Sequence, residues 1–353
     1  MPVSDTQTPN TAAFVSYLAE KRPLIESRLA GACPHAAAAD GTCADDLERY
    51  LYRPLERFCA SGGKRTRPAL CLLGAEAVGG SAESALSAAV AVETFQSAAL
   101  IHDDIADEGE LRRGVPCLHV SDGIGIATNV GDLALVVSTQ AILDDEALGA
   151  DVRLRLIDEL MGMERRTLEG QALDLGWVRD GRWDITVDDY LYMASHKTAY
   201  YSAAVPLVMG AICAGASEGQ IEALRSFGMA AGLAFQLQDD LLNLVGDAEA
   251  QGKDFRSDIT EGKRTMAAVW AVGHLPEKSA DELVELFSAK TTDAARLARA
   301  VELMEESGAI DEVRAGSREL ANEAKGHLAS ADFSPSARRT LTSMADFFVE
   351  RLG

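Results

Sequence analysis

The stretch AESALSAAVAVETFQSAALIHDDIAD, residues 82–107, decides the fold class of this chain. Its apolar residues fall on most faces of a helix, and it is long enough for about seven helical turns. Such a helix is stable in water only when other elements cover it, so the stretch predicts a central, buried helix. Residues 217–246 have the same character and predict a second one.

The rest of the chain is also predicted to be helical. Between Pro116 and Pro276 the only proline is Pro206, and aromatic residues, which favour strands, make up 6% of the chain. Apolar spacing predicts helices near residues 11–30, 44–60, 65–78, 82–107, 121–146, 151–176, 186–215, 217–246, 263–273, 278–290, 292–307, 309–329 and 334–351. Because no Pro-, Gly- or Ser-rich linker divides them, we expect one all-α domain over residues 11–353, after a disordered segment at residues 1–10.

Composition and charge exclude several classes of function. The 353 residues include 33 lysines and arginines against 55 aspartates and glutamates, a net charge of −22, and 47% are hydrophobic. These values exclude a disordered or fibrous chain and disfavour binding to nucleic acids or anionic membranes. The six cysteines form no CxxC pair and predict buried, reduced thiols. Without a signal-peptide pattern or a run of about 18 apolar residues, we expect a soluble cytoplasmic protein.

The segment LIHDDIADEGELRRG, residues 100–114, carries the first chemical signal. Asp103 and Asp107 lie four residues apart, on one helix face and about 6 Å from each other, with Asp104 beside them. Such carboxylates repel each other unless a cation lies between them, and Mg²⁺ binds a few carboxylates while waters or phosphate oxygens complete its shell. A solvated acidic helix end is the alternative, but the apolar residues just before Asp103 argue against it.

A second acidic pair lies in the other buried helix. Asp239 and Asp240 stand among leucines in FQLQDDLLNLVGD, residues 235–247, so their charges need compensation. One acidic cluster could arise by chance in so acidic a chain, whereas two in long apolar helices are much less expected. Facing each other across a bundle, they would form a carboxylate cage for several cations, the arrangement that clamps a diphosphate.

Positively charged segments complete the pattern. GGKRTRP, residues 62–68, places Lys64, Arg65 and Arg67 at a helix start, where free N–H groups and the helix dipole favour an anion. Further cations and a hydroxyl follow at Lys197, Thr198, Lys253 and Lys263. Each group alone could be solvated, but together they predict phosphate ligands. Two anion sites beside a metal cage predict two phosphorylated substrates, and the chain has no Walker or dinucleotide-binding motif.

In this order, the motifs resemble those of the trans-isoprenyl diphosphate synthases, the polyprenyl synthetase family. The resemblance extends from about Tyr52 to the C-terminus. It rests on the motifs GGKRTRP (62–68), DDIAD (103–107) with LRRG (111–114), GD (131–132), KT (197–198), FQ (235–236) with DD (239–240), and GKRT (262–265). It implies the isoprenoid synthase fold, a single large helical bundle around a central cavity, in a homodimer. It also implies a prenyltransferase with about three Mg²⁺ ions per active site. Isopentenyl diphosphate would be joined head to tail to an allylic diphosphate (dimethylallyl, geranyl or farnesyl), giving an all-trans short-chain polyprenyl diphosphate.

The resemblance assigns a role to each motif residue. The residues expected to hold Mg²⁺ are Asp103, Asp107 and Asp239. The neighbouring acids Asp104 and Asp240 are expected to support them. Those expected to contact the allylic diphosphate are Arg112, Lys197, Lys253 and Lys263, and those near the breaking C–O bond are Thr198 and Gln236. Those expected to bind isopentenyl diphosphate are Lys64, Arg67, Gln96, Arg113 and Phe235. The released diphosphate would take the proton, which fits the lack of a strong general-base candidate.

Three positions depart from the family pattern. Gln96 stands where the family often has a histidine that contacts isopentenyl diphosphate, and an amide can donate the same hydrogen bond. Asn243 replaces the last aspartate of the second motif, while Asp239 remains. Cys117-Leu118-His119 stands where Thr-Val-His is usual, a change on the scale of packing. None of these changes removes a residue that the mechanism requires.

Two other functions are compatible with these motifs. A class I terpene cyclase also ionises an allylic diphosphate with metal ions, but it would have no ligand for Lys64, Arg67 and Arg113. A non-catalytic partner subunit usually loses aspartates of the first motif, and this chain has kept all three. Elongation, cyclisation or neither, on incubation with both diphosphates, would distinguish the three functions.

The residues before Asp103 predict the product length. Phe95 and Ala99 share its helix face, and small side chains at Ala98 and Ala99 leave space until the Phe95 ring, about 12 Å away. An isoprene unit extends about 4–5 Å, so roughly three units fit beyond the one nearest the diphosphate. This predicts geranylgeranyl diphosphate, with farnesyl and geranylfarnesyl diphosphate as neighbouring possibilities. Alternatively, Phe95 packs against another helix and only fills the core.

Overall fold

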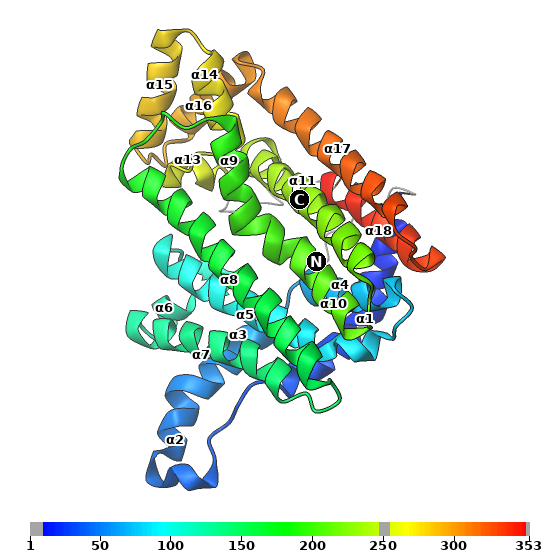
Figure 1. Cartoon of the computed structure of the whole chain (residues 1–353). Coiled ribbons are helices and arrows are strands. Elements are labelled where there is room, and N and C mark those ends of the chain that lie inside the picture. The colour runs from blue at the N-terminus through cyan, green and yellow to red at the C-terminus, as the bar shows by residue number, and fades with distance from the viewer. Residues whose placement is uncertain (1–9, 247–254, 351–353) are drawn as a thin grey trace.

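The computed structural model describes residues 10–246 and 255–350, and this part of the chain is almost entirely helical (Figure 1). The α-helices are α1 (Ala12–Ala30), α2 (Ala44–Leu47), α3 (Arg53–Ala60), α4 (Thr66–Ala77), α5 (Leu86–Ala106), α6 (Leu118–Ser121), α7 (Ile124–Leu143), α8 (Ala150–Arg179), α9 (Val187–Ala194), α10 (Val205–Cys213), α11 (Glu218–Val245), α13 (Ser257–Glu261), α14 (Met266–His274), α15 (Glu277–Ser288), α16 (Ala294–Glu306), α17 (Ala309–His327) and α18 (Pro335–Glu350). Wider π turns form η2 (Glu48–Tyr52) and η4 (Ser195–Ala204), and 3₁₀ turns form η1 (Ala38–Cys43), η3 (Ala82–Ala85) and η6 (Leu328–Ser330). The predicted all-α fold class is confirmed.

The predicted helices are present, but those at residues 44–60 and 186–215 each have three parts. The first runs through α2, η2 and α3 and the second through α9, η4 and α10, and in each the middle part has the wider π turns. Pro206 lies in the first turn of α10, directly after η4, and Ala204 before it keeps right-handed helical angles. A proline has no N–H to donate, and it is accommodated where the regular hydrogen-bond pattern already changes.

A two-residue hairpin follows the first aspartate motif and was not predicted. Its strands are β1 (Leu111–Arg112) and β2 (Val115–Pro116), with Arg112 paired to Val115. The turn consists of Arg113 and Gly114, whose φ angles are +53° and +80°. Two consecutive positive φ angles are typical of the tight type I′ hairpin turn. The LRRG segment is therefore a tight turn whose two arginines reach different partners, Arg112 the Asp104 carboxylate and Arg113 the Gly62 carbonyl.

The long helices α5 and α11 are central, as predicted. α5 packs against α4 and α7, and α11 packs against η4 and α17. α11 also connects two hydrophobic clusters: its first half belongs to the cluster around α4, α5 and α10, and its second half to the cluster of α9 and α13–α17. The acidic pair of α11 thus lies in the half that meets the second cluster, whose helices α13–α17 are drawn yellow to orange and α9 green in Figure 1.

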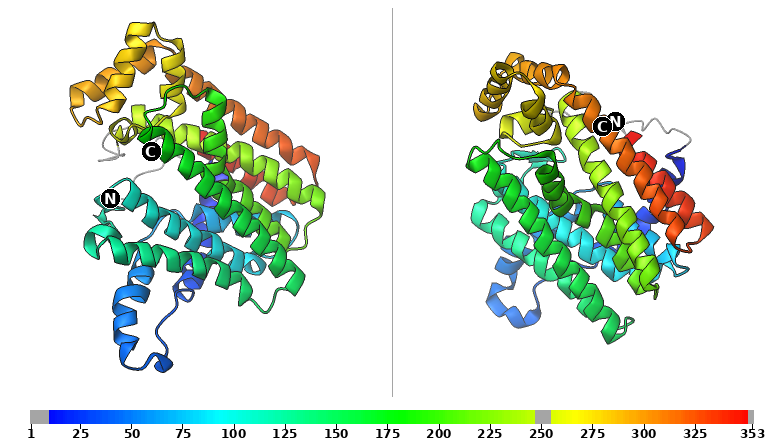
Figure 2. Two further views of the ribbon diagram at one scale, coloured as in Figure 1. Left: turned by 60° about the vertical axis from the view of Figure 1, so that its left-hand side comes forward. Right: turned by 45° about the horizontal axis from the view of Figure 1, so that its top comes forward.

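Two other features define the outline of the molecule. A short arm made of η1 and α2 projects from the helical body (Figures 1 and 2). The first and last helices, α1 and α18, pack against each other. The backbone N–H of Phe14 in α1 donates to the Ser343 hydroxyl of α18 at 3.1 Å. The two ends of the described chain are therefore joined at one side of the bundle.

Two expectations about apolar and cysteine residues need correction. Cys43 is exposed on the arm, so the prediction that all cysteines are buried is wrong at this position. Within the described part of the chain, two helices are also long and apolar enough for a membrane span, at Ala82–Ala106 and Ile124–Leu143. The first has 72% of its apolar window buried in the protein and is a core helix, whereas the second has 39% buried. Length and hydropathy alone do not make either one a membrane helix.

Candidate active site

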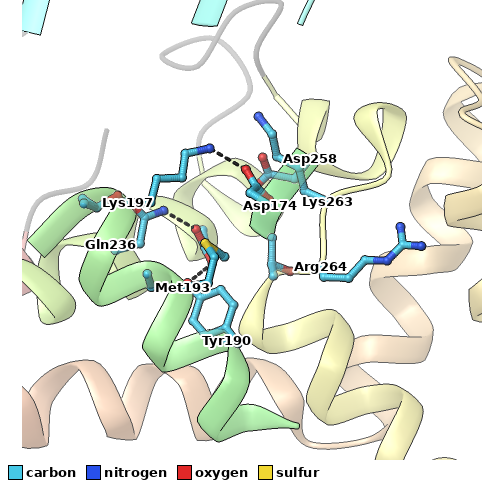
Figure 3. Close-up of a pocket in the computed structure, with 12 residues that line it drawn as sticks. Asp174, Tyr190, Met193, Lys197, Gln236, Asp258, Lys263 and Arg264 are labelled. Carbon is cyan, nitrogen blue, oxygen red and sulfur yellow. Dashed lines mark hydrogen bonds and ion pairs between the residues drawn. The ribbon is translucent and has the colours of Figure 1, made fainter. Parts of the chain in front are cut away.

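A pocket of about 90 Å³ gathers acids and lysines from α8, η4, α11, α13 and the loop that follows α13 (Figure 3). We call it the mixed-charge pocket, and its lining residues are Asp174, Tyr190, Met193, Ala194, Lys197, Thr198, Gln236, Asp240, Asp258, Lys263, Arg264 and Thr265. The fold brings together five residues predicted from the sequence to share one catalytic centre: Lys197, Thr198, Gln236, Asp240 and Lys263.

The two lysines of this pocket each contact carboxylates. Lys197 pairs with Asp174 of α8, toward which it points in Figure 3. Lys263 lies 3.3 Å from Asp107 and pairs with Glu261. Burial alone lowers the pKa of a lysine, but the surrounding carboxylates outweigh it and raise the pKa of both side chains. Both lysines are therefore firmly protonated and positioned between acids.

The acids of the site are crowded as well as buried. Burial is the main cause that raises the pKa of Asp107 and of Asp240 to about 6, and Lys263 opposes the shift at Asp107. Burial likewise raises the pKa of Asp258 to about 8, with Asp240 and Glu261 adding to it and Lys263 opposing it. Carboxylates with raised pKa values lack compensation for their charge. A cation bound beside them would supply that compensation.

The oxygen atoms of the first aspartate motif suit a hard cation whose remaining ligands are waters or phosphate oxygens. Asp103 accepts a hydrogen bond from Gln171 at 2.9 Å. Asp104 accepts from Arg112 at 2.7 and 2.6 Å through one oxygen, and its other oxygen is buried without a hydrogen-bond partner in residues 10–246 and 255–350. In these same residues no three potential ligands lie close enough to hold a metal alone. Mg²⁺ suits this arrangement, since it takes one or two carboxylates and completes its shell with phosphate oxygens.

A chain of hydrogen bonds fixes Thr198, Gln236 and Asp240 in this pocket. The Thr198 hydroxyl donates to the Gln236 carbonyl oxygen at 2.7 Å, and the Gln236 amide donates to Asp240 at 2.7 Å. Tyr190 donates to the other Asp240 oxygen at 2.6 Å. Asp240 thus acts as an anchor for Gln236. Because the Thr198 hydrogen is used on Gln236, the lone pairs of the Thr198 oxygen are left for the pocket.

The structure explains the altered second motif. Asn243 accepts a hydrogen bond from the backbone N–H of Asp258 at 3.2 Å and donates to the Ser257 hydroxyl at 3.1 Å. It therefore holds the start of α13, the helix that carries Asp258 into the pocket. Asp239, one residue before Asp240 on α11, is half-buried. Lys253 lies outside the described residues.

A second pocket, of about 130 Å³, contains the residues predicted to bind isopentenyl diphosphate. We call it the arginine pocket, and its lining residues are Gly63, Lys64, Arg65, Thr66, Arg67, Glu93, Gln96, Arg113, Ser202, Phe235, Phe347 and Phe348. Lys64, Arg67, Gln96, Arg113 and Phe235 all belong to it. Their positions in the sequence are far apart, so this grouping is a result of the fold.

The cations of the arginine pocket have different surroundings. Arg65 is buried, pairs with Glu93 at 2.5 Å and donates to the Cys59 carbonyl at 2.7 Å, so its charge is used inside the protein. Arg67 donates to the Ser202 hydroxyl at 2.7 Å and lies over the Tyr201 ring. These partners are neutral, and they leave the charge of Arg67 available for an anion.

Arg113 and Gln96 are the next polar side chains of this pocket. Arg113 reaches back from the hairpin to the Gly62 carbonyl and the Ser61 hydroxyl. In the amide orientation that satisfies both neighbours, Gln96 donates to Glu93 at 3.0 Å and accepts from Arg67 at 2.9 Å. Gln96 therefore orients Arg67 while it remains in the pocket wall.

The residues predicted to set product length lie on the buried side of α5. Phe95 is 3% exposed and its ring meets the Tyr201 ring edge-on, with 5.9 Å between centroids. Ala98 is fully buried, whereas Ala99 is half-buried. Ala99, one turn before Asp103, is thus the more accessible of the two alanines.

Several residues of the two pockets were not predicted. Asp174 had a detectable signal, since it falls on the buried stripe of α8 that runs through Leu160, Met163, Thr167 and Gly170. An acid on such a stripe needs a buried partner. Tyr190, Asp258, Phe347 and Phe348 had no comparable signal, because nothing near them in sequence marks them as pocket residues.

The chain is similar to proteins of one family. The polyprenyl synthetase family model matches residues 48–304. A short chain isoprenyl diphosphate synthase of Methanothermobacter thermautotrophicus is 37% identical over 309 residues, which cover 87% of this chain and 92% of the relative. The crystal structure of geranylgeranyl pyrophosphate synthetase from Pyrococcus horikoshii Ot3 matches with a TM-score of 0.86 and 30% identity, over 96% of this chain and 98% of that one. The Corynebacterium glutamicum geranylgeranyl pyrophosphate synthase, complexed with isoprenyl diphosphate and magnesium, has a TM-score of 0.80 and 30% identity over 97% of each chain.

Proposed function

Because the chain belongs to the polyprenyl synthetase family, we propose that it joins isopentenyl diphosphate head to tail to an allylic diphosphate and releases geranylgeranyl diphosphate. The enzyme is a prenyltransferase that elongates trans-prenyl diphosphates. Its family membership supports the two substrates and the use of Mg²⁺, and the product length and the residue roles are our proposals. We further propose that it works in the cytoplasm.

The observation that carries this proposal is the presence of two pockets with different means of binding an anion. The mixed-charge pocket combines acids with lysines, which suits a diphosphate that arrives with metal ions. The arginine pocket offers cations with neutral partners, which suits a diphosphate without metal. A terpene cyclase has one diphosphate to bind, so the arginine pocket favours an elongating enzyme.

In the mixed-charge pocket, the protein would bind and orient the allylic diphosphate. Asp103, Asp107 and Asp239 do not line this pocket, but Asp107 lies 3.3 Å from Lys263, which does. These three aspartates would hold about three Mg²⁺ ions beside the pocket, and the ions would neutralise the charge that develops on the leaving diphosphate. Lys197 and Lys263 would bind its oxygens, a role for which both are protonated. Because these lysines already contact Asp174 and Asp107, the acids hold them in place before the substrate arrives.

The groups next to the lysines would stabilise the allylic cation. The Thr198 oxygen, whose hydrogen is donated to Gln236, presents lone pairs to the pocket. Tyr190 and Asp240 fix the Gln236 amide, so neither dipole has to reorient as charge develops. The double bond of isopentenyl diphosphate, held by Lys64, Arg67 and Arg113, would attack this cation. The released diphosphate would then accept the proton.

A single incubation tests the proposed reaction. Purified enzyme, Mg²⁺, isopentenyl diphosphate and dimethylallyl, geranyl or farnesyl diphosphate should give a polyprenyl diphosphate, identified by mass spectrometry after dephosphorylation. A twenty-carbon alcohol is the expected main product. A cyclic hydrocarbon would mean a terpene cyclase, and no product with any starter would mean a non-catalytic subunit.

The product length is tested on α5. We propose that the prenyl tail runs past Ala99, beside the buried Ala98, and stops at Phe95, about 12 Å from Asp103 at 1.5 Å rise per residue. Phe95→Ala should then lengthen the product and Ala99→Phe should shorten it to about fifteen carbons or fewer. If Phe95 only fills the core against Tyr201, Phe95→Ala should cost a few kcal/mol of stability and leave the product unchanged.

We also propose that the enzyme is a homodimer. α8 carries four exposed apolar side chains at intervals of seven residues, Leu154, Met161, Leu168 and Leu175. This spacing keeps them on one stripe, and such a stripe rarely remains exposed in a monomer. A molar mass of two chains in light scattering, reduced to one chain by Leu168→Glu, would support this assembly.

A further inference from the structure

We infer that two phenylalanines of the last helix, Phe347 and Phe348, form the wall that recognises the hydrocarbon part of isopentenyl diphosphate. The inference rests on the proposed function, because it concerns the substrate of the arginine pocket. Both side chains line that pocket together with Lys64 and Arg67. They belong to α18, outside the residues 48–304 that match the family model.

The pocket separates into a charged part and an aromatic part. Among the described residues that line it, the large apolar side chains are Phe235, Phe347 and Phe348. A diphosphate bound by Lys64, Arg67 and Arg113 leaves a short branched hydrocarbon of five carbons to be covered. Because an alkenyl group gains free energy only against apolar surface, it lies against these three rings.

The two rings of α18 occupy different places in the wall. The Phe348 ring lies 4.8 Å from the Phe235 ring, centroid to centroid. Phe235 directly precedes Gln236, which lines the mixed-charge pocket, so Phe348 stands on the side toward the reacting carbons. The Lys64 ammonium lies 5.9 Å from the centre of the Phe347 ring, so Phe347 stands on the side toward the diphosphate.

The first helix, α1, packs against Phe347 and Phe348 and supports them. The Phe14 ring of α1 packs against Phe347 and Phe348, with centroids 5.5 and 6.1 Å apart. Its backbone N–H binds the Ser343 hydroxyl, and the side chain is fully buried. Phe348 is 1% exposed and Phe14 fully enclosed, so the wall cannot move back to admit a larger group without cost. The geometry therefore assigns to Phe348 the selection of the substituent at carbon 3 of the homoallylic substrate.

The test compares isopentenyl diphosphate with its 3-ethyl homologue, in which an ethyl group replaces the methyl group. For Phe348→Ala, the ratio of kcat/KM for the homologue to kcat/KM for isopentenyl diphosphate should rise at least about tenfold. A hydrophobic pocket discriminates one methylene by about 10–200-fold, and removal of the ring removes that discrimination. Phe348→Leu, which preserves packing better, should give an intermediate ratio. The KM for the allylic diphosphate should change less than about threefold in both variants.

Phe347 has a different expected effect. Phe347→Ala should raise the KM for isopentenyl diphosphate with little change in the ratio, and Phe347→Tyr, which keeps a ring under Lys64, should restore it.

Phe333→Ala is the matched control. Phe333 is buried just before α18 and does not line the pocket, so its truncation should lower the melting temperature and leave the ratio unchanged. An unchanged ratio in folded Phe348→Ala and Phe348→Leu would overturn the inference. If the unmodified enzyme did not elongate isopentenyl diphosphate, the proposed function would fail instead, so the two failures are distinguishable.

Discussion

The mixed-charge pocket and the arginine pocket are both built for anions, yet they hold positive charge in different ways. In the mixed-charge pocket, Lys197 contacts Asp174 and Lys263 lies 3.3 Å from Asp107. In the arginine pocket, Arg67 contacts the Ser202 hydroxyl and Arg113 a backbone carbonyl. The lysines of the first pocket are therefore paired with acids of the protein, whereas Arg67 and Arg113 of the second pocket have neutral partners and remain available for a ligand.

This difference bears on how each pocket would bind a diphosphate. Carboxylates around the lysines repel a diphosphate unless divalent cations lie between them. Burial raises the pKa values of Asp107, Asp240 and Asp258, and neighbouring carboxylates add to the shift. Cations with neutral partners attract a diphosphate directly. One pocket should depend on metal ions and the other should not.

Removal of a metal ligand should have the largest effect. Asp103→Asn or Asp239→Asn is expected to reduce kcat by about 10²–10³-fold or more, because each removes a charge that would hold Mg²⁺ beside the mixed-charge pocket. Steady-state kinetics measure the loss, and circular dichroism should remain helical. Asp281→Asn, at an exposed position of α15, is the control and should retain activity. Near-normal rates in either ligand variant would contradict the metal-binding role.

Substitutions in the arginine pocket should act on one substrate. Arg67→Ala is expected to raise the KM for isopentenyl diphosphate about 10–100-fold, the value of one or two charge-assisted hydrogen bonds, and Lys64→Ala should act in the same direction. The KM for the allylic diphosphate should change less than about threefold. An equal change for both substrates would mean that the pockets are not separate sites.

Arg65 provides a contrast within the same segment. Arg65→Ala should destabilise the protein by about 3–5 kcal/mol, since it leaves the buried Glu93 carboxylate without its cation. Chemical denaturation measures this loss. A stable Arg65→Ala variant with an altered KM would show that Arg65 binds substrate after all.

The stabilisation of the protein by Mg²⁺ should depend on pH, because acids in and beside the mixed-charge pocket have raised pKa values. Burial raises the pKa of Asp107 and Asp240 to about 6, so without metal the folded state binds protons more tightly than the unfolded state. Their stabilising contribution is full below about pH 4 and is lost as the pH rises to about 6. Mg²⁺ requires ionised carboxylates, so the increase in melting temperature that Mg²⁺ produces should grow from pH 5 to pH 7. Asp107→Asn should reduce the increase in melting temperature that Mg²⁺ produces. An increase that is equal at pH 5 and pH 7 in the unmodified protein would contradict metal binding by these carboxylates.

The smallest expected effect concerns Gln96. Gln96→His introduces the residue that the family often has there, and a neutral imidazole can replace the amide as a hydrogen-bond donor. At pH 8 the KM for isopentenyl diphosphate should change less than about threefold. Below about pH 6.5 the imidazole gains charge and the KM should fall, since a further cation favours the diphosphate. A pH-independent KM would mean that position 96 does not face the substrate.

The sequence alone predicted the fold class, the helices and the main functional segments. Periodicity records which side of a helix is buried, and this was enough for α5 and α11. Acidic pairs in apolar helices and a cationic segment at a helix start are local signals too, so Asp103, Asp240 and Lys64 could be identified from their neighbours in the chain.

Tertiary structure alone decided which of these charges are used inside the protein and what completes each pocket. Arg65 and Arg67 are two residues apart and look alike in sequence, but Arg65 meets a buried glutamate and Arg67 a serine 135 residues away. The aromatic wall depends on a contact between Phe14 and Ser343, which are 329 residues apart. Periodicity and composition are properties of neighbouring residues, whereas the free energy of a charge or a ring depends on what the fold places beside it.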